Sequence, residues 1–137
     1  MYAKIMVPVD LEHRERLGKA LKTAADLAKA NGAPICYVGI TATTPGPVAH
    51  TPAEFARKLE AFAEEQAAAQ GVVASAKAYT SHDPAVDLDK VLEKAIEELG
   101  CDLVVMASHI PGFPEHIFAS KAGYLAQHAK ISVFVVR

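Results

Sequence analysis

The sequence has few of the features that mark a secreted, metal-binding or membrane protein. It holds no tryptophan and only two cysteines in 137 residues, too few for the disulfide framework of a small secreted domain. Cys36 and Cys101 fit no metal-ligand spacing, so we expect two small buried side chains in a reduced, cytoplasmic protein. The N-terminal segment lacks a long apolar run, so we expect neither a signal peptide nor a membrane span.

An excess of one charge is also missing. The chain has 14 Lys and Arg against 16 Asp and Glu, with a net charge of −2 and no run of basic residues. General electrostatic attraction to nucleic acid or to an anionic membrane is therefore not expected.

The common catalytic motifs are absent as well. No serine stands in a G-x-S-x-G context, no Walker lysine follows a glycine-rich loop, and neither HExxH nor CxxC occurs. Asp83 and Asp87 are explained as acids in the first turn of a helix. The histidines follow no metal-ligand spacing, and we expect all six to be solvated: His13, His50, His82, His109, His116 and His128. The sequence thus predicts no catalytic set and no metal site, and an enzymatic role has little support.

What the sequence does contain is a regular alternation of strand and helix patterns. Short apolar runs predict strands at Lys4–Asp10, Pro34–Ile40, Val72–Tyr79, Asp102–Met106 and Ser132–Arg137. Apolar residues at helical spacing predict helices at Glu12–Asn31, Thr51–Gly71, Asp83–Gly100 and Ile117–Ala129. This order predicts one α/β domain over residues 1–137, a three-layer sandwich with a five-stranded, mostly parallel sheet. The alternating Val72–Tyr79 strand is expected near a sheet edge, and the apolar Asp102–Met106 strand near the centre.

Local signals mark where the helices begin and end. Thr51-Pro52 with Glu54 is typical of a capping box, and Asp83-Pro84 repeats the combination of a cap and a first-turn proline. Gly32, Gly71 and Gly100 are expected to end helices, because glycine accepts the left-handed conformation found there.

Ligands of parallel α/β sheets bind outside the carboxyl ends of the strands, where the strand order reverses. The loops after Val9, Ile40 and Met106 are therefore the candidate binding loops. The last of these, MASHIPGFPEHIFASKA (Met106–Ala122), runs from a strand end into a helix start, which is a position suited to an anion.

Taken together, KIMVPVD near the start, DLVVMASH, and AQHAKISVFVVR at the end resemble the universal stress protein family over nearly the whole chain. The resemblance implies a flavodoxin-like or adenine-nucleotide α-hydrolase-like fold. It also implies a non-enzymatic role in the stress response and a homodimer formed through the final strand.

Many members of that family bind ATP through a loop of the form G-x-x-G, a spacer, and G-(S/T). Here Ala107, Ile110 and Ala119-Ser120 stand at those positions, whereas Ser108-His109 and Pro111-Gly112 fit a shorter variant of the loop. The resemblance implies an adenosine pocket formed by Pro8, Val9, Asp10, Ile40 and Met106. It implies a phosphate site formed by Ala107, His109, Ile110, Gly112, Ala119, Ser120 and Lys121.

Several of these residues have simpler explanations. Asp10 and Ser120 are both suited to capping a helix, and Lys121 is suited to an exposed helix face. An alanine in place of glycine costs roughly 1 kcal/mol or more if φ is positive, and only steric space otherwise. We expect ATP binding to be weakened or lost; the alternative is a working ATP or AMP sensor that tolerates the alanines.

The final strand, SVFVVR, is apolar and terminal. An uncovered apolar edge promotes pairing with another strand, so Val133, Phe134 and Val135 predict a homodimer. The alternative is a monomer in which this strand is protected.

Overall fold

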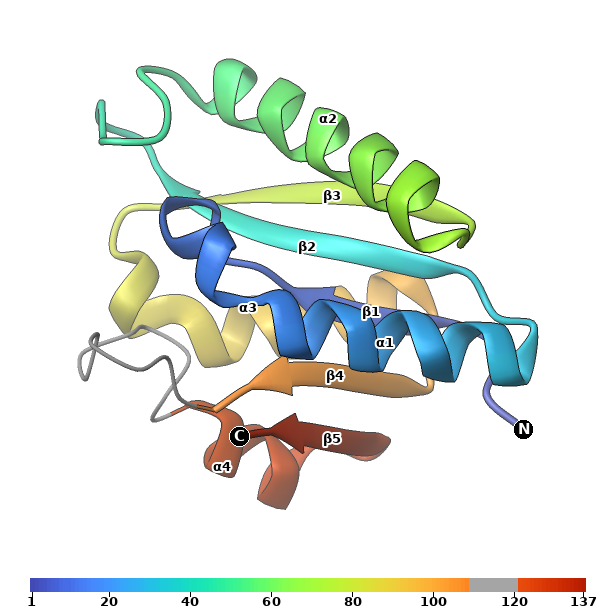
Figure 1. Ribbon diagram of the computed structural model, residues 1–137. Helices are drawn as coiled ribbons and strands as arrows, with labels where there is room; N and C mark the ends of the chain where they lie inside the picture. The colour runs from blue at the N-terminus through green and yellow to red at the C-terminus, as the bar shows by residue number, and fades with distance from the viewer. Residues whose placement is uncertain (109–120) are drawn as a thin grey trace.

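The computed structural model describes residues 1–108 and 121–137. Figure 1 shows a twisted sheet with α1 and α2 on one face and α3 and α4 on the other. The elements, in chain order, are β1 (Ile5–Pro8), the 3-10 helix η1 (Leu11–Arg16), α1 (Gly18–Asn31), β2 (Ile35–Ala42), α2 (Pro52–Gln70), β3 (Ala74–Ser81), α3 (Pro84–Leu99), β4 (Leu103–Ala107), α4 (Lys121–His128) and β5 (Ser132–Val136).

The strands follow the order β3-β2-β1-β4-β5, and all four pairings are parallel. The predicted α/β sandwich is therefore confirmed, with a sheet that is wholly rather than mostly parallel. β3 and β5 form the two edges, and β4 lies inside the sheet as its apolar sequence predicts. The chain builds outward from β1 to β3 and then returns to the other side of β1, so the strand order reverses between β1 and β4.

Two hydrophobic clusters fill the spaces between the sheet and its helices. One contains Val7 with Leu21 of α1 and Leu59 of α2. The other contains Met6 with Leu92 of α3 and Leu125 of α4. Neighbouring residues of a strand point to opposite faces, so β1 contributes to both clusters and is buried on both sides.

The predicted helix signals act as expected. Thr51 Oγ1 accepts a hydrogen bond from the Glu54 N–H at 3.1 Å, and an Asp83 side-chain oxygen accepts one from the Val86 N–H at 3.4 Å. The glycines that follow α1, α2 and α3 have φ values of 62°, 68° and 65°: Gly32, Gly71 and Gly100. The Glu54 carboxylate accepts from the His50 N–H at 3.3 Å, one residue before the cap.

Element boundaries differ from the prediction mainly at the first helix. Instead of one helix from Glu12, the chain forms η1 and then α1 from Gly18. Leu17 (φ −93°, ψ 5°) separates the two helices, and within η1 the backbone angles at His13 (φ −119°, ψ 29°) are not helical. The start predicted for the last helix, at Ile117, lies outside the described residues.

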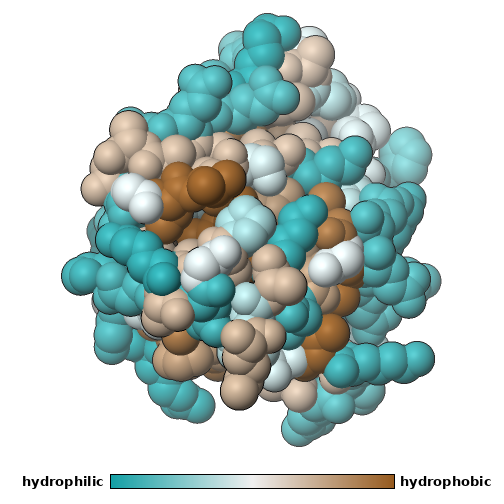
Figure 2. Space-filling view, turned by 90° about the vertical axis from the view of Figure 1, so that its right-hand side faces the viewer, coloured by the Kyte–Doolittle hydropathy of each residue, from teal (hydrophilic) through white to brown (hydrophobic). Residues whose placement is uncertain are grey.

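Figure 2 looks onto the end of the molecule where the strands begin, opposite the predicted binding loops. A cleft of about 340 Å³ there lies between the ends of α1 and α2 and includes Val72 and Val73. Among the described residues that line it, Lys29 alone is charged. Cys36 and Cys101 are free and buried, as predicted. In the described ranges, no helix is both long and apolar enough to cross a membrane.

Candidate functional site

The carboxyl ends of the parallel strands lie together at one end of the sheet. We call this end the carboxyl edge, and it is distinct from the edge strands β3 and β5. After β1, the Val9 N–H still donates to the Val38 carbonyl of β2 at 2.9 Å. After β4, the Ser108 N–H donates to the Val136 carbonyl of β5 at 2.9 Å. The chain therefore leaves β1 and β4 at the carboxyl edge, and these are the two strands between which the strand order reverses.

Asp10 is the first polar side chain beyond β1. Its Oδ1 accepts a hydrogen bond from the Glu12 N–H at 3.1 Å, which makes it the N-cap of η1. Its Oδ2 lies 2.9 Å from Nδ1 of His13. The capping role weighed from the sequence is confirmed, and it occupies only one of the two carboxylate oxygens.

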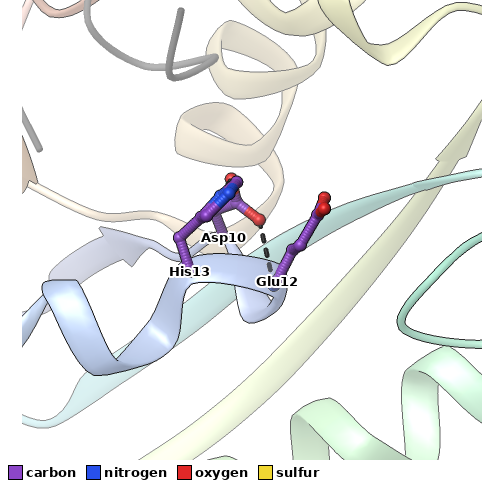
Figure 3. A group of neighbouring side chains, drawn as sticks. All are labelled: Asp10, Glu12 and His13. Atoms are coloured by element: carbon purple, nitrogen blue, oxygen red, sulfur yellow. Dashed lines mark hydrogen bonds and ion pairs between the residues drawn. The ribbon is translucent and has the colours of Figure 1, made fainter. Parts of the chain in front are cut away.

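The solvated position predicted for His13 is wrong. Its side chain is 19% exposed and that of Asp10 is 18% exposed, because the two pack against one another. The His13 N–H also donates to the Asp10 carbonyl at 3.1 Å, so this turn brings the two side chains together. Figure 3 shows Asp10, Glu12 and His13 projecting together from this single turn, with Glu12 on the exposed side. Three further histidines are exposed as predicted, and two lie outside the described residues: His50, His82 and His128, and then His109 and His116.

The predicted adenosine residues lie at this edge but differ in accessibility. Val9 is 2% exposed and belongs to the cluster under α1 and α2, whereas Met106 is 0% exposed and belongs to the cluster under α3 and α4. Pro8 is also buried. Ile40, on β2, is only half-buried, so among the apolar members it offers the largest accessible surface.

The conformation of Ala107 shows whether this position needs a glycine, which the sequence alone leaves open. It is the last residue of β4, and no non-glycine residue in the described part of the chain has a positive φ. Its side chain is 7% exposed and belongs to the cluster under α1 and α2. The backbone at this position therefore does not need a glycine, and the methyl group packs into the core.

Most of the predicted phosphate site cannot be placed. His109, Ile110, Gly112, Ala119 and Ser120 lie outside the described residues. Lys121 is the first residue of α4, so its backbone lies at the beginning of that helix.

A cleft of about 420 Å³ adjoins η1, between the β2–α2 connection and α2. Arg14 and Lys58, the basic residues that line it, pair with Glu65 and Glu54 respectively. The His50 N–H and the Lys58 ammonium group hold the pKa of the Glu54 carboxyl below its usual value. The other lining residues are Leu11, Glu12, Pro47, Val48 and Ala61. The sequence analysis did not predict this cleft or a role for the DLEHR segment (residues 10–14) as a whole. The signal for that segment is its run of polar residues directly after a buried strand.

The fold and the site together define a doubly wound parallel α/β protein whose candidate site residues follow β1, at the point where the strand order reverses. The sequence matches the Universal stress protein family over residues 1–137. The chain belongs to this family.

Similar proteins extend over the whole chain. Universal stress protein G of Shigella flexneri is 31% identical over 147 aligned residues, covering 100% of both chains. A solved family member from Burkholderia pseudomallei has a TM-score of 0.68 at 23% identity, with 98% of this chain and 96% of that chain covered. A universal stress protein from Archaeoglobus fulgidus in complex with dAMP has a TM-score of 0.66 at 19% identity, with 99% and 98% covered.

Proposed function

We propose that this chain is a non-enzymatic stress-response protein that binds the adenosine part of a nucleotide more firmly than its phosphates. The pocket lies at the carboxyl edge of the sheet, outside β1 and β4. The observation that carries the proposal is the Asp10 carboxylate, fixed through one oxygen at the point where the strand order reverses. The dAMP complex of the Archaeoglobus fulgidus protein, which has the same fold, supports an adenine nucleotide as the ligand.

The residues at this edge suit an adenosine. A carboxylate oxygen accepts hydrogen bonds from ribose hydroxyls or from the adenine amino group, and Asp10 Oδ2 takes that role by exchanging its contact with His13. Ile40 provides apolar surface for the base. Pro8, Val9 and Met106 shape the pocket from within the core.

Weak phosphate binding follows from the residues of the loop after β4. In the shorter variant of the family loop a cation stands where this chain has Ile110, so a favourable charge interaction with the phosphates is missing. Ala119 adds a methyl group where the family loop has a glycine, which leaves room for backbone N–H groups to approach a phosphate. Ser120 and Lys121 remain as a hydroxyl and a cation next to these positions.

Ala107 favours the alternative function, a working ATP or AMP sensor. Because its backbone is an ordinary strand and its methyl group packs in the core, this alanine gives no reason for phosphate binding to fail. The choice between the two functions therefore rests on Ile110 and Ala119.

Calorimetric titration of the purified chain with ATP and with AMP, both in EDTA, tests the proposal. We expect the two affinities to agree within about tenfold, because a difference of about 1.4 kcal/mol would already indicate extra phosphate contacts. Ala119→Gly should raise the affinity for ATP more than that for AMP, whereas Ala107→Gly should change neither. Asp10→Asn should weaken both nucleotides alike.

Submicromolar binding of ATP by the unmodified chain would establish the alternative sensor. Failure of both nucleotides to bind would refute the adenosine pocket itself. Steady ATP turnover that Asp10→Ala abolishes would contradict the non-enzymatic part of the proposal.

We also propose that the protein works as a cytoplasmic homodimer joined through β5. One edge of β5 pairs with β4, and no strand of the described chain pairs with the other. Phe134 on this strand is 46% exposed, an unusually open position for a large apolar side chain. A second copy would bury Phe134 and satisfy the open edge.

A further inference from the structure

We propose that Asp10, Glu12 and His13 form a binding site for a divalent first-row transition-metal ion such as Mn²⁺ or Zn²⁺. This inference goes beyond the proposed nucleotide pocket and does not depend on it, because the three side chains come from one short segment of the chain. It revises the expectation of no metal site, which considered the histidines after β4 and regarded His13 as solvated.

The spacing of the donor atoms fits a common ion. One imidazole nitrogen and two carboxylate oxygens lie within 4.8 Å of one another. Two donors about 2.1 Å from the same ion and at right angles to each other are about 3 Å apart. Asp10 Oδ2 and His13 Nδ1 are separated by 2.9 Å, so this pair already has the required spacing.

Two of the donors are held in place before any ion arrives. The Glu12 N–H fixes Asp10 through Oδ1 and leaves Oδ2 directed at His13. The His13 N–H donates to the Asp10 carbonyl at 3.1 Å, which fixes the turn itself. Hydrogen bonds of this kind orient metal ligands and raise affinity. An ion would lie between Asp10 and His13 in place of their direct contact, and the exposed Glu12 side chain would close over it.

The donor types indicate which ions bind. Mg²⁺ and Ca²⁺ prefer sites made entirely of oxygen, whereas an imidazole with carboxylates suits manganese, iron or zinc. Three side chains would leave further coordination positions for water or a ligand. These positions lie at the carboxyl edge of the sheet, where Asp10 follows β1.

Titration with MnCl₂ in the absence of nucleotide, followed by the electron paramagnetic resonance of free Mn²⁺, tests the site. We expect the chain to remove one equivalent of Mn²⁺ from solution. His13→Ala and Glu12→Gln should each weaken binding by about tenfold or more, in line with the usual cost of disturbing a metal site.

His82→Ala is the matched control, since His82 is exposed and also follows a strand at this edge of the sheet. This variant should bind Mn²⁺ as the unmodified chain does. Circular dichroism establishes whether each variant is folded, and the exposed Glu12 allows a test even if His13→Ala is unstable. Absence of Mn²⁺ binding by the unmodified chain, or equal binding by the folded variants, would overturn the proposal. The nucleotide titrations in EDTA are unaffected by that result, so the two proposals fail separately.

Discussion

Tyr37 is a buried residue whose hydroxyl makes no hydrogen bond within the described ranges. The side chain is 0% exposed, and burial raises the pKa of its hydroxyl to about 12. Tyr37→Phe removes an unsatisfied polar group while keeping the ring contact with Phe62. We expect the free energy of unfolding to rise by about 1 kcal/mol, measured by urea denaturation. Tyr79→Phe is the control: its hydroxyl donates to Glu98 at 2.8 Å, so its removal should bring no gain.

Asp102 joins the N-terminal segment to the beginning of β4. Its carboxylate accepts from the Ala3 N–H at 2.9 Å and from the Lys4 N–H at 3.1 Å. These bonds lower the pKa of Asp102 in the folded chain. The stabilisation is therefore complete above the usual aspartate pKa of about 3.9 and is lost as the pH falls below it.

Asp102→Asn should lower stability at neutral pH, because it removes the negative charge and because an amide nitrogen in place of Oδ2 cannot accept the 2.9 Å bond from the Ala3 N–H. It should also flatten the fall in stability at acidic pH. Thermal unfolding at a series of pH values between about 2 and 7 measures both effects, across the usual titration range of aspartate. A variant that loses stability on acidification as steeply as the unmodified chain would contradict this assignment.

At the scale of single residues, the sequence supports predictions where a side chain acts on its near neighbours. Asp10 could be recognised as a cap because a polar residue directly precedes a helical segment. The partial burial of His13 could not, since it depends on the contact of its ring with Asp10 in the folded turn. The core packing of Ala107 also needs the folded chain, because it follows from the contacts of β4 with α1.

Gly39 determines how closely two elements approach one another. A Cβ atom at this position in β2 would lie 2.8 Å from Cζ of Phe55 and 3.1 Å from Cδ2 of Leu59, both on α2. Gly39→Ala must therefore push α2 outward or displace buried side chains. We expect a loss of about 1–3 kcal/mol in the free energy of unfolding, measured by urea denaturation.

The matched control for this effect is Gly46→Ala in the β2–α2 connection, where a Cβ atom meets nothing within 4 Å. Its stability should stay within about 0.5 kcal/mol of the unmodified chain. Equal stability of the two variants would show that the contact between β2 and α2 adjusts without cost.

At the scale of elements, helix ends were the most predictable feature. Thr51, Asp83 and the three glycines act through bonds to residues only a few positions away. The division of the first helix was missed, because the polar residues 12–16 that precede Leu17 include no proline or glycine to mark a stop. β3 also begins and ends two residues later than predicted, at Ala74 and Ser81.

Assembly is tested at the scale of the whole molecule. Phe134→Lys places a charge on the open strand β5, and we expect it to convert the proposed dimer into monomers in sedimentation velocity. Val73→Lys is the control, because Val73 is 75% exposed and precedes β3 at the other edge of the sheet. Val133 and Val135 are less suitable, since both pack partly against the core. An unmodified chain that sediments as a monomer would refute the proposed dimer.

The layered architecture could be predicted from pattern alone, because apolar strands that alternate with amphipathic helices have few ways to bury both. The alternating sequence of β3 and the apolar sequence of β4 even indicated their places in the sheet. The site was predicted only in outline. Strand order determines which loops meet. Which side chains can contact a ligand depends on whether Val9, Ile40 and Met106 are buried in the core.

The strand order also has a consequence for synthesis on the ribosome. β2 adds to β1, β3 adds to β2, β4 takes the free side of β1, and β5 adds to β4. Every strand therefore joins an edge that is open when it emerges, and none has to enter between two paired neighbours. The nascent sheet can grow in the order of translation, and the free side of β1 stays unpaired until β4 has been synthesised.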